Sequence, residues 1–320
     1  MGLRPTYKQG ARFYEIGTEK SGVRVENALF LMLSLLFQQP AVLYDAFTEF
    51  SDKHVSPAPF RRITYNDAVM KFGSDKPDFR NPLTICDLTE FCTHVEFAAF
   101  KNKPVRGIVA NCSGRPRSFF DNSLKYATSI GMKGLGYITL TQDDFKGSLV
   151  KFLSPDQKKQ LISDCNIKED QTLFFISDRP DAVNKLAGKI REWLGKTLDL
   201  IDKNAFEFCF VVDFPMYEHN PETNKIEFTH NPFSMPQGGL TALETKNPLQ
   251  ILAFQYDVVC NGIELSSGAV RNHLPEIMKK AFQIAGYSKE ELEKRFGAWY
   301  KAFQYGAPPL PEWRRASTVS

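Results

Sequence analysis

The stretch YDVVCNGIELSSGAVRNH, residues 256–273, decides the fold of this chain. Asn261 and Gly262 stand between two apolar runs. They favour a type I′ turn, because both central positions of that turn require positive φ. The pattern therefore predicts two antiparallel strands joined by a two-residue loop, with Val259 facing Glu264 across the pair.

Three charged residues interrupt this apolar pattern: Asp257, Glu264 and Arg271. The predicted register makes the two carboxylates diagonal neighbours on one sheet face, roughly 7–8 Å apart at the backbone. They are then close enough to share a divalent cation. Arg271 reaches the same face if a bulge forms at Ser266–Gly268. Such a face suits a ligand with metal-bound phosphate and a carboxylate. The alternative is a solvated face whose charges pair across strands.

The composition is that of an ordinary globular protein. The chain has 320 residues, of which 42% are apolar and 24% charged, and its net charge is +3. This length favours about two domains. A net charge this small does not argue for nucleic acid by itself, so any basic binding surface must be local.

The cysteines and the longest apolar run predict a soluble, intracellular protein. The six cysteines form no CxxC motif, which indicates free thiols in a reducing compartment. Cys86, Cys92 and His94 lie close together but fit no familiar zinc module. The apolar run at residues 28–37 is too short for a bilayer, which needs about 20 residues. We expect residues 28–50 to form a core element instead.

Between residues 83 and 200 the signals alternate between helix and strand, which predicts a self-contained α+β unit. Ser154 and Gln157 form a capping box that opens a helix through residue 164. Further helices are expected at 118–130 and 181–195, and strands at 134–140 and 172–177. Outside this unit we expect a structured loop at 73–82, a strand at 206–217, and helices after Pro275 and after the capping box of Ser288.

These motifs resemble those of bacterial-type aspartyl-tRNA synthetase, a class II enzyme. The opening stretch is similar to the active-site hairpin of that family. Five further motifs resemble it in the same order: FGSDKPDFRNP (72–82), GMKGLGYI (131–138), VVDFPMYE (211–218), THNPFSMP (229–236) and FGAWYKAFQYGAPP (296–309). The resemblance covers residues 55–309.

The resemblance implies an α+β fold: an incomplete class II synthetase antiparallel sheet flanked by helices and interrupted by an inserted α+β domain. The implied domains are a partial catalytic domain (1–82, with 1–40 unassigned), the inserted domain (83–200), the continued catalytic domain (201–309) and a disordered tail (310–320).

The resemblance also implies the activity of an aspartate–tRNA ligase. ATP is the substrate that activates L-aspartate to aspartyl-adenylate, and the aspartyl group then passes to the 3′ end of tRNA-Asp, or also of tRNA-Asn. Glu264 is expected to contact ATP directly or through Mg²⁺, and Asp257 to help hold that metal. Arg271 resembles the arginine that binds the side-chain carboxylate of aspartate. His230 resembles the histidine of a loop that closes over the site. No residue is expected to serve as a general acid or base.

Several elements of the family pattern are missing from the sequence. The Arg-x-Glu signature, the QSPQ-type loop, the glycine-rich strand after Pro309 and the first signature, which forms the homodimer in the family, are all absent. We therefore expect a truncated copy that is inactive alone. The alternative function is a non-catalytic remnant that binds tRNA or protein through the inserted domain. That domain carries a local basic stretch, for which a solvated loop is the other interpretation: Lys101, Lys103, Arg106, Arg115 and Arg117.

Overall fold

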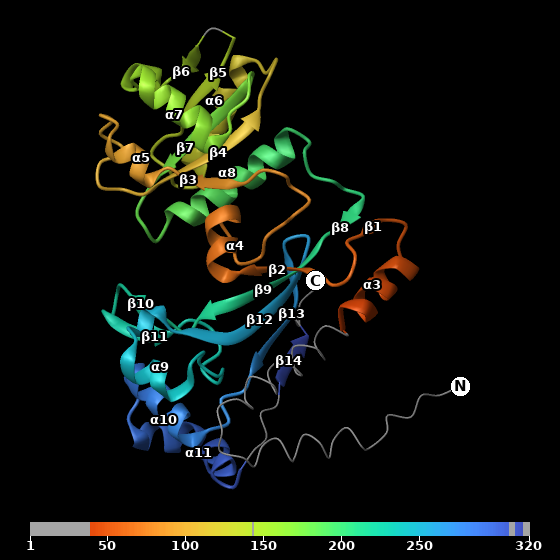
Figure 1. Ribbon diagram of the computed structural model, residues 1–320, viewed down its shortest axis with the longest axis vertical. Coiled ribbons are helices and arrows are strands. Elements are labelled where there is room, and N and C mark those ends of the chain that lie inside the picture. Colours follow the sequence, from red (N-terminus) through yellow and green to blue (C-terminus); the bar gives the residue numbers. More distant parts are fainter. Residues whose placement is uncertain (1–38, 143, 307–310, 316–320) are drawn as a thin grey trace. The chain divides into compact units, whose positions relative to one another are not determined.

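The computed structural model describes residues 39–142, 144–306 and 311–315, and the chain divides into two compact units (Figure 1). The first unit comprises the described residues of Met1–Tyr65, Phe208–Cys260 and Glu264–Ser320. The second unit comprises those of Asn66–Glu207 together with Asn261–Ile263. The second unit thus contains the range 83–200 and also the loop at 73–82.

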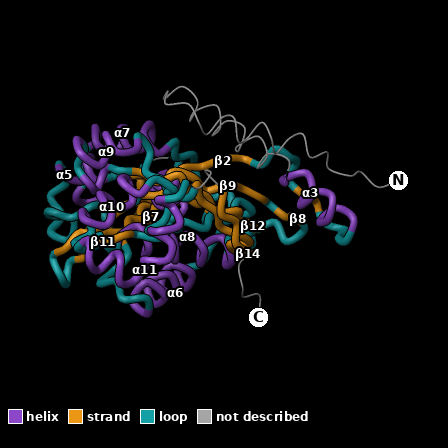
Figure 2. Tube along the Cα trace, turned by 90° about the horizontal axis from the view of Figure 1, so that it is seen from below, coloured by secondary structure: helices purple, strands orange, loops and turns teal. Residues whose placement is uncertain are grey.

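A five-stranded sheet forms the centre of the first unit, in the order β14-β13-β12-β9-β2 (Figure 1). Its strands are β2 (Arg61–Thr64), β9 (Phe208–Pro215), β12 (Leu252–Cys260), β13 (Ile263–Val270) and β14 (Pro311–Arg315). β9 and β12 are antiparallel and run alongside each other in Figure 2. β2 is parallel to β9. A parallel pair needs a long connection, and here more than a hundred residues separate the two strands.

The remaining elements of the first unit surround this sheet or extend from it. They are α3 (Gln39–Glu49), β1 (His54–Val55), β10 (Tyr217–Asn220), β11 (Lys225–Phe228), α9 (Gly239–Thr245), the 3₁₀ turn η2 (Pro248–Gln250), α10 (Pro275–Ile284) and α11 (Lys289–Gln304). The predicted helix starts are confirmed, since Pro275 occupies the first turn of α10 and Ser288 caps α11 with Glu291. Tyr217 packs in the core and donates a hydrogen bond to the carbonyl oxygen of Ala281 at 3.0 Å.

Two ends of the first unit differ from the sequence-based expectation. Within the tail expected to be disordered, Pro311–Arg315 form β14, which pairs with β13 from Ser266↔Arg315 to Val270↔Pro311. This pairing satisfies backbone groups that an edge strand would leave open. Of the core element expected at 28–50, only the part from residue 39 is described. This part exposes Val42 (67%) and Phe50 (82%) but packs the ring of Phe47 against the buried ring of Phe208, so it lies at the edge of the core.

The second unit is built on a separate antiparallel sheet, in the order β3-β4-β7-β5-β6. Its elements are α4 (Tyr65–Phe72, which begins one residue before the unit), β3 (Ile85–Asp87), α5 (Thr89–Thr93), β4 (Val105–Asn111), α6 (Arg117–Ser129), β5 (Gly136–Leu140), β6 (Phe145–Gly147), the 3₁₀ turn η1 (Val150–Phe152), α7 (Pro155–Cys165), β7 (Gln171–Ser177), α8 (Val183–Thr197) and β8 (Ala205–Phe206). The predicted helices and strands of this region are confirmed, including the capping box of Ser154.

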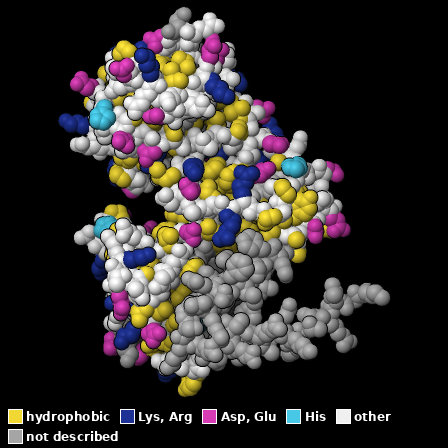
Figure 3. Space-filling view, viewed as in Figure 1, with side chains coloured by type: hydrophobic (Ala, Val, Ile, Leu, Met, Phe, Trp, Pro, Cys, Tyr) yellow, Lys and Arg dark blue, Asp and Glu magenta, His cyan; other side chains and the backbone are white. Residues whose placement is uncertain are grey.

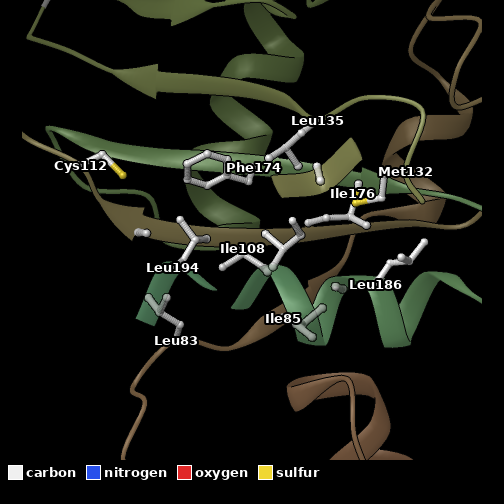
Figure 4. Close-up of a cluster of buried hydrophobic side chains, with 14 of the residues drawn as sticks. Leu83, Ile85, Ile108, Cys112, Met132, Leu135, Phe174, Ile176, Leu186 and Leu194 are labelled. Atoms are coloured by element: carbon white, nitrogen blue, oxygen red, sulfur yellow. The ribbon is translucent and has the colours of Figure 1, made fainter. Parts of the chain in front are cut away.

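Helices cover both faces of the second sheet, which explains why the four central residues of β7, at 173–176, are all apolar. Leu173 and Phe175 face a core with α5 and α7. Phe174 and Ile176 point the opposite way, into a core with α6 and α8 (Figure 4). Strands buried on both faces have continuous apolar runs rather than alternation. Among the described helices, none is both long and apolar enough to cross a membrane.

Candidate functional site

The predicted turn is present at the tip of β12 and β13. Asn261 has a φ of 54° and Gly262 a φ of 81°, as a type I′ turn requires. The Asn261 side chain also anchors the turn: it accepts a hydrogen bond from the backbone N–H of Glu207 at 2.9 Å and donates one to the carbonyl oxygen of Ala205 at 3.0 Å. The two-residue turn therefore lies at the residues that the sequence predicts.

The two carboxylates of the hairpin lie in different surroundings. Asp257 is 8% exposed and stands opposite Val211 of β9. Glu264 lies in β13 and is half-exposed. Carboxylates are seldom this buried unless a partner or metal compensates for the lost hydration. The separation of the two carboxylates stays a prediction from the turn register.

Arg271 lies directly after β13, and its backbone is joined to the segment that follows His230. Residues 271 and 234 form an isolated antiparallel bridge. On either side of it, Met235 donates to the carbonyl oxygen of Val270 at 2.7 Å, and Asn272 donates to that of Phe233 at 2.6 Å. The end of β13 therefore runs beside the segment at 231–236.

The same segment is bonded to β12 on its other side. The backbone N–H of Phe254 donates to the carbonyl oxygen of Met235 at 2.9 Å. The Gln255 amide donates to Ser234 Oγ at 2.6 Å and to the Asn231 carbonyl oxygen at 3.1 Å. The segment thus lies between β12, which carries Asp257, and the strand end that carries Arg271.

His230 stands at the exposed beginning of this segment. Its ring centroid lies 5.0 Å from that of Phe214 and 5.8 Å from that of Tyr65. Backbone hydrogen bonds therefore bring together the strands that carry three of the four predicted residues. The exposed imidazole of His230 lies against the buried ring of Phe214 and the half-buried ring of Tyr65.

The bulge expected at Ser266–Gly268 stays a prediction for the pairing of β13 with β12, and the structure gives Gly268 a further role beside Tyr256. The register of β13 against β14 runs without a shift from Ser266 to Val270. A Cβ at Gly268 would stand 2.3 Å from Cζ of Tyr256, so glycine leaves room for that ring. Burial raises the pKa of Tyr256 to about 12. A register shift is present in β12, between Ala253 and Tyr256, in its pairing with β9.

Sequence reasoning missed several polar residues around these strands. Gln255 fixes the segment after His230, as described above. Asp213, with a φ of 58°, accepts a hydrogen bond from the Gln237 amide at 2.7 Å. Asn272 is fully buried, and its side-chain amide has no hydrogen-bond partner among the described residues. Gln255 in AFQYD and Asp213 in VVDFP could have been identified from the sequence, because each is a polar residue inside an otherwise apolar strand.

The loop at 73–82 is structured, as predicted. Asp78 pairs with Arg80 at 2.7 Å. The amide of Asn81 donates to the carbonyl oxygen of Arg191 at 3.0 Å, and the Arg191 guanidinium donates back to the carbonyl oxygens of Asp78 and Asn81. Arg191 thus fixes this loop within the second unit.

The basic stretch of the second unit is smaller than the sequence suggests. Arg106 is 6% exposed and donates to Asp87 Oδ1 at 2.6 Å and to Asn184 Oδ1 at 2.8 Å, so it belongs to the interior. On the face drawn in Figure 3, Lys and Arg side chains are scattered among Asp and Glu. The described residues of this face therefore show no continuous basic patch of the kind that binds phosphates.

The described residues also contain no group of three or more His, Cys, Asp and Glu side chains placed to hold a metal ion. Cys86, Cys92 and His94 are not placed as such a group. A pair of carboxylates is still compatible with Mg²⁺, because this ion is commonly bound by one or two carboxylates together with substrate phosphates.

Comparisons with known proteins agree with one another on the family. A family model described as "tRNA synthetases class II (D, K and N)" matches residues 13–311. The chain is 50% identical over 308 residues to the aspartate--tRNA(Asp/Asn) ligase of Rickettsia bellii (strain OSU 85-389), covering 93% of this chain and 50% of that protein. It is 49% identical, with the same coverage, to the corresponding ligase of Rickettsia africae (strain ESF-5).

The chain spans about half the length of the curated relatives that it matches. A solved aspartyl tRNA synthetase from Entamoeba histolytica is 16% identical, with a TM-score of 0.26, covering 66% of this chain and 38% of that chain. A structural likeness at this level supports no inference.

Proposed function

The chain belongs to the class II tRNA synthetases of the D, K and N group, and from this membership we propose that it contributes ATP- and aspartate-binding residues to an aspartate–tRNA ligase. The observation that carries the proposal is the position of the segment at 231–236. It is hydrogen-bonded to β12, which carries Asp257, and to the strand end that carries Arg271. Residues able to bind a phosphate-bound metal ion and a carboxylate are thereby grouped in the first unit.

Each residue has a role that follows from its chemistry. Arg271 binds the side-chain carboxylate of aspartate, because a guanidinium presents two parallel donors to a carboxylate. Asp257 and Glu264 hold Mg²⁺ together with the phosphates of ATP. The magnesium ion neutralises charge on those phosphates when it is bound. His230, exposed at the start of its segment, contacts the aminoacyl site.

The reaction proposed is an in-line displacement followed by acyl transfer. An α-carboxylate oxygen of aspartate attacks the α-phosphorus of ATP, the bond to pyrophosphate breaks, and aspartyl-adenylate forms. A hydroxyl at the 3′ end of tRNA then attacks the activated carbonyl and releases AMP. Positioning and electrostatic stabilisation supply the acceleration, so no general base is assigned.

The acceptor that we propose is tRNA-Asp, with tRNA-Asn as a second acceptor suggested by the names of the relatives. The cytoplasmic location that the resemblance implies belongs to the same proposal.

The test is binding of a non-reactive aspartyl-adenylate analogue, in which a sulfamoyl group replaces the phosphate, to the purified chain. Arg271→Ala is expected to weaken binding at least about tenfold, because a hydrogen bond to a charged group is worth about 1.5–3 kcal/mol. Lys294→Ala removes an exposed cation from the same unit and should leave the affinity unchanged.

Equal binding of the asparaginyl analogue, or an Arg271→Ala variant with normal affinity, would contradict the proposal. Aspartate-dependent ATP–pyrophosphate exchange, with Glu264→Ala as its control, then measures whether the chain alone forms the adenylate.

A further inference from the structure

Two cysteines of the second unit lie side by side at the wall of a cavity. Cys86 belongs to β3, and Cys165 is the last residue of α7. Their sulfur atoms are 3.5 Å apart, and both residues are half-buried. The cavity has a volume of about 350 Å³. The residues proposed above for ATP and aspartate belong to the first unit, so this thiol pair needs its own explanation.

The surrounding backbone holds both sulfur atoms in place. Cys86 stands opposite Gly107 in the register of β3 and β4, and its thiol donates to the Gly107 carbonyl oxygen at 3.4 Å. A Cβ at residue 107 would stand 2.7 Å from Cys86 Sγ, so the glycine leaves room for the sulfur. Cys165 is fixed by the end of α7, which Asn166 caps with a left-handed conformation.

The two thiols are chemically unequal. The hydrogen bond from Cys165 lowers the pKa of Cys86, although burial and the charge of Asp87 act against this shift. The same hydrogen bond, together with burial, raises the pKa of Cys165. Cys86 is therefore the thiol that reaches the thiolate form, which is the reactive form of cysteine.

The neighbouring cysteines do not share this arrangement. Cys92 and Cys112 are buried, and burial raises their pKa values to about 12 and about 11. Both are expected to stay protonated and inert, so they provide internal controls within the same unit.

We propose that Cys86 and Cys165 form a thiol-oxidation site that closes to a disulfide when hydrogen peroxide enters the cavity. The Cys86 thiolate attacks one peroxide oxygen, the O–O bond breaks, and a sulfenic acid and hydroxide form. That hydroxide takes the proton of the Cys165 thiol and becomes water. The Cys165 sulfur attacks the sulfenic sulfur and displaces a second hydroxide, which takes up the proton that Cys86 had released and leaves as water. In total, two thiols and one peroxide give one disulfide and two waters, so the sulfurs are oxidised and the peroxide is reduced. The sulfur atoms must close from 3.5 Å to about 2.05 Å.

The charge of the cavity favours a neutral oxidant. Glu90 and Asp164 line it, together with Asp87, whose charge is partly offset by its ion pair with Arg106. These carboxylates repel glutathione disulfide, which carries net negative charge, whereas hydrogen peroxide is small and uncharged. We therefore assign peroxide as the oxidant of this site.

The experiment exposes the full chain to hydrogen peroxide, blocks the remaining thiols under denaturing conditions and maps the peptides by mass spectrometry. The chain is expected to lose the mass of two hydrogen atoms. Of the six thiols present, only Cys86 and Cys165 should escape blocking, as one cross-linked pair of peptides that dithiothreitol separates.

Two variants test which cysteine reacts first with peroxide and which one then closes the disulfide. In Cys165→Ser the disulfide is lost, and dimedone traps a sulfenic acid on Cys86. In Cys86→Ser the thiol of Cys165 stays reduced at the same peroxide dose. Cys112→Ala is the matched control and should form the disulfide as the wild type does.

The wild-type peptide map tests the site even if a variant fails to fold. A disulfide between other cysteines, or oxygen added to Cys86 without a bond to Cys165, would overturn the proposal. Faster reaction with glutathione disulfide than with peroxide would overturn the assignment of the oxidant.

Discussion

Arg191 brings a guanidinium into the interior of the second unit, where it is 2% exposed. Its nitrogens donate to the carbonyl oxygens of Leu83, Asp78 and Asn81 at 2.5, 2.8 and 2.7 Å. Burial lowers its pKa to about 10, and the charge of Asp78 acts in the opposite direction. Because one side chain satisfies three carbonyls, the end of the loop at 73–82 depends on it.

Replacing this arginine should therefore be costly. Arg191→Ala leaves three buried carbonyls without their donor and is expected to lower the free energy of unfolding by about 3 kcal/mol or more. Denaturant unfolding followed by circular dichroism measures the loss. Lys189→Ala, an exposed cation on the same helix, should change stability by less than about 0.5 kcal/mol. Equal effects of the two substitutions would show that Arg191 does not hold the loop.

His273 makes stability depend on pH. Burial lowers its pKa, while its ring nitrogen Nδ1 lies 3.2 Å from the carbonyl oxygen of Arg271. Because its folded-state pKa lies below the unfolded value, the unfolded chain binds the proton more readily in acid. The free energy of unfolding should therefore fall as the pH drops below about 6.5.

Unfolding curves measured across this pH range, for wild type and His273→Gln, test the prediction. The variant should lack part of the acid-induced loss, whereas His219→Gln, at an exposed position, should retain it. If His273→Gln and wild type lose stability in parallel, His273 does not contribute to the pH dependence.

At the scale of single elements, the sequence predicts those helix starts and turns that depend on residues close together in the chain. The capping boxes of Ser154 and Ser288 start α7 and α11, and Asn261-Gly262 makes the turn. These features depend on residues a few positions apart. The strand order, the parallel pairing of β2 and the addition of β14 depend on segments that are distant in the sequence, so no local pattern predicts them.

The same distinction applies to the candidate site. Asp257, Glu264 and Arg271 are identifiable because a charge in an apolar strand is unusual. The need for glycine at position 268 cannot be read from the sequence, because it depends on the position of the Tyr256 ring on the neighbouring strand. Likewise, the hydrogen-bond acceptors of Arg191 lie 108–113 residues away from it.

The pairing of Tyr256 with Gly268 gives a prediction for β12 and β13. Gly268→Ala places a methyl group where the ring lies, since its Cβ would stand 2.3 Å from Cζ. The expected cost is about 1–3 kcal/mol of stability. Tyr256→Ala combined with Gly268→Ala should cost less than the sum of the two single changes, because the clash is then absent.

Gly297→Ala in α11 is the matched control, because a Cβ there meets open space. That change should raise stability by up to about 1 kcal/mol through helix propensity. All three substitutions can be measured by denaturant unfolding of the purified chain, and additive effects at 256 and 268 would contradict the proposed contact.

At the scale of the whole molecule, the second unit has the attributes of an independent folding unit. Its sheet is covered on both faces, and each face has its own cluster of buried side chains. Its loop at 73–82 is fixed by Arg191, from the same unit. Asn261 is hydrogen-bonded to this unit at Ala205, in its last strand β8, and at Glu207, which directly follows that strand.

Residues 66–207 expressed alone are therefore expected to fold and to unfold in one cooperative transition, measured by circular dichroism and intrinsic fluorescence. Phe174→Ala, at a fully buried position of β7, should destabilise this fragment by about 3–5 kcal/mol. Lys159→Ala, whose side chain is 82% exposed, should leave it within about 0.5 kcal/mol. A fragment that melts gradually, or is insensitive to the loss of Phe174, would mean that its two cores depend on the first unit. Cooperative melting would mean that the residues proposed to bind ATP and aspartate can be altered without affecting the fold of the second unit.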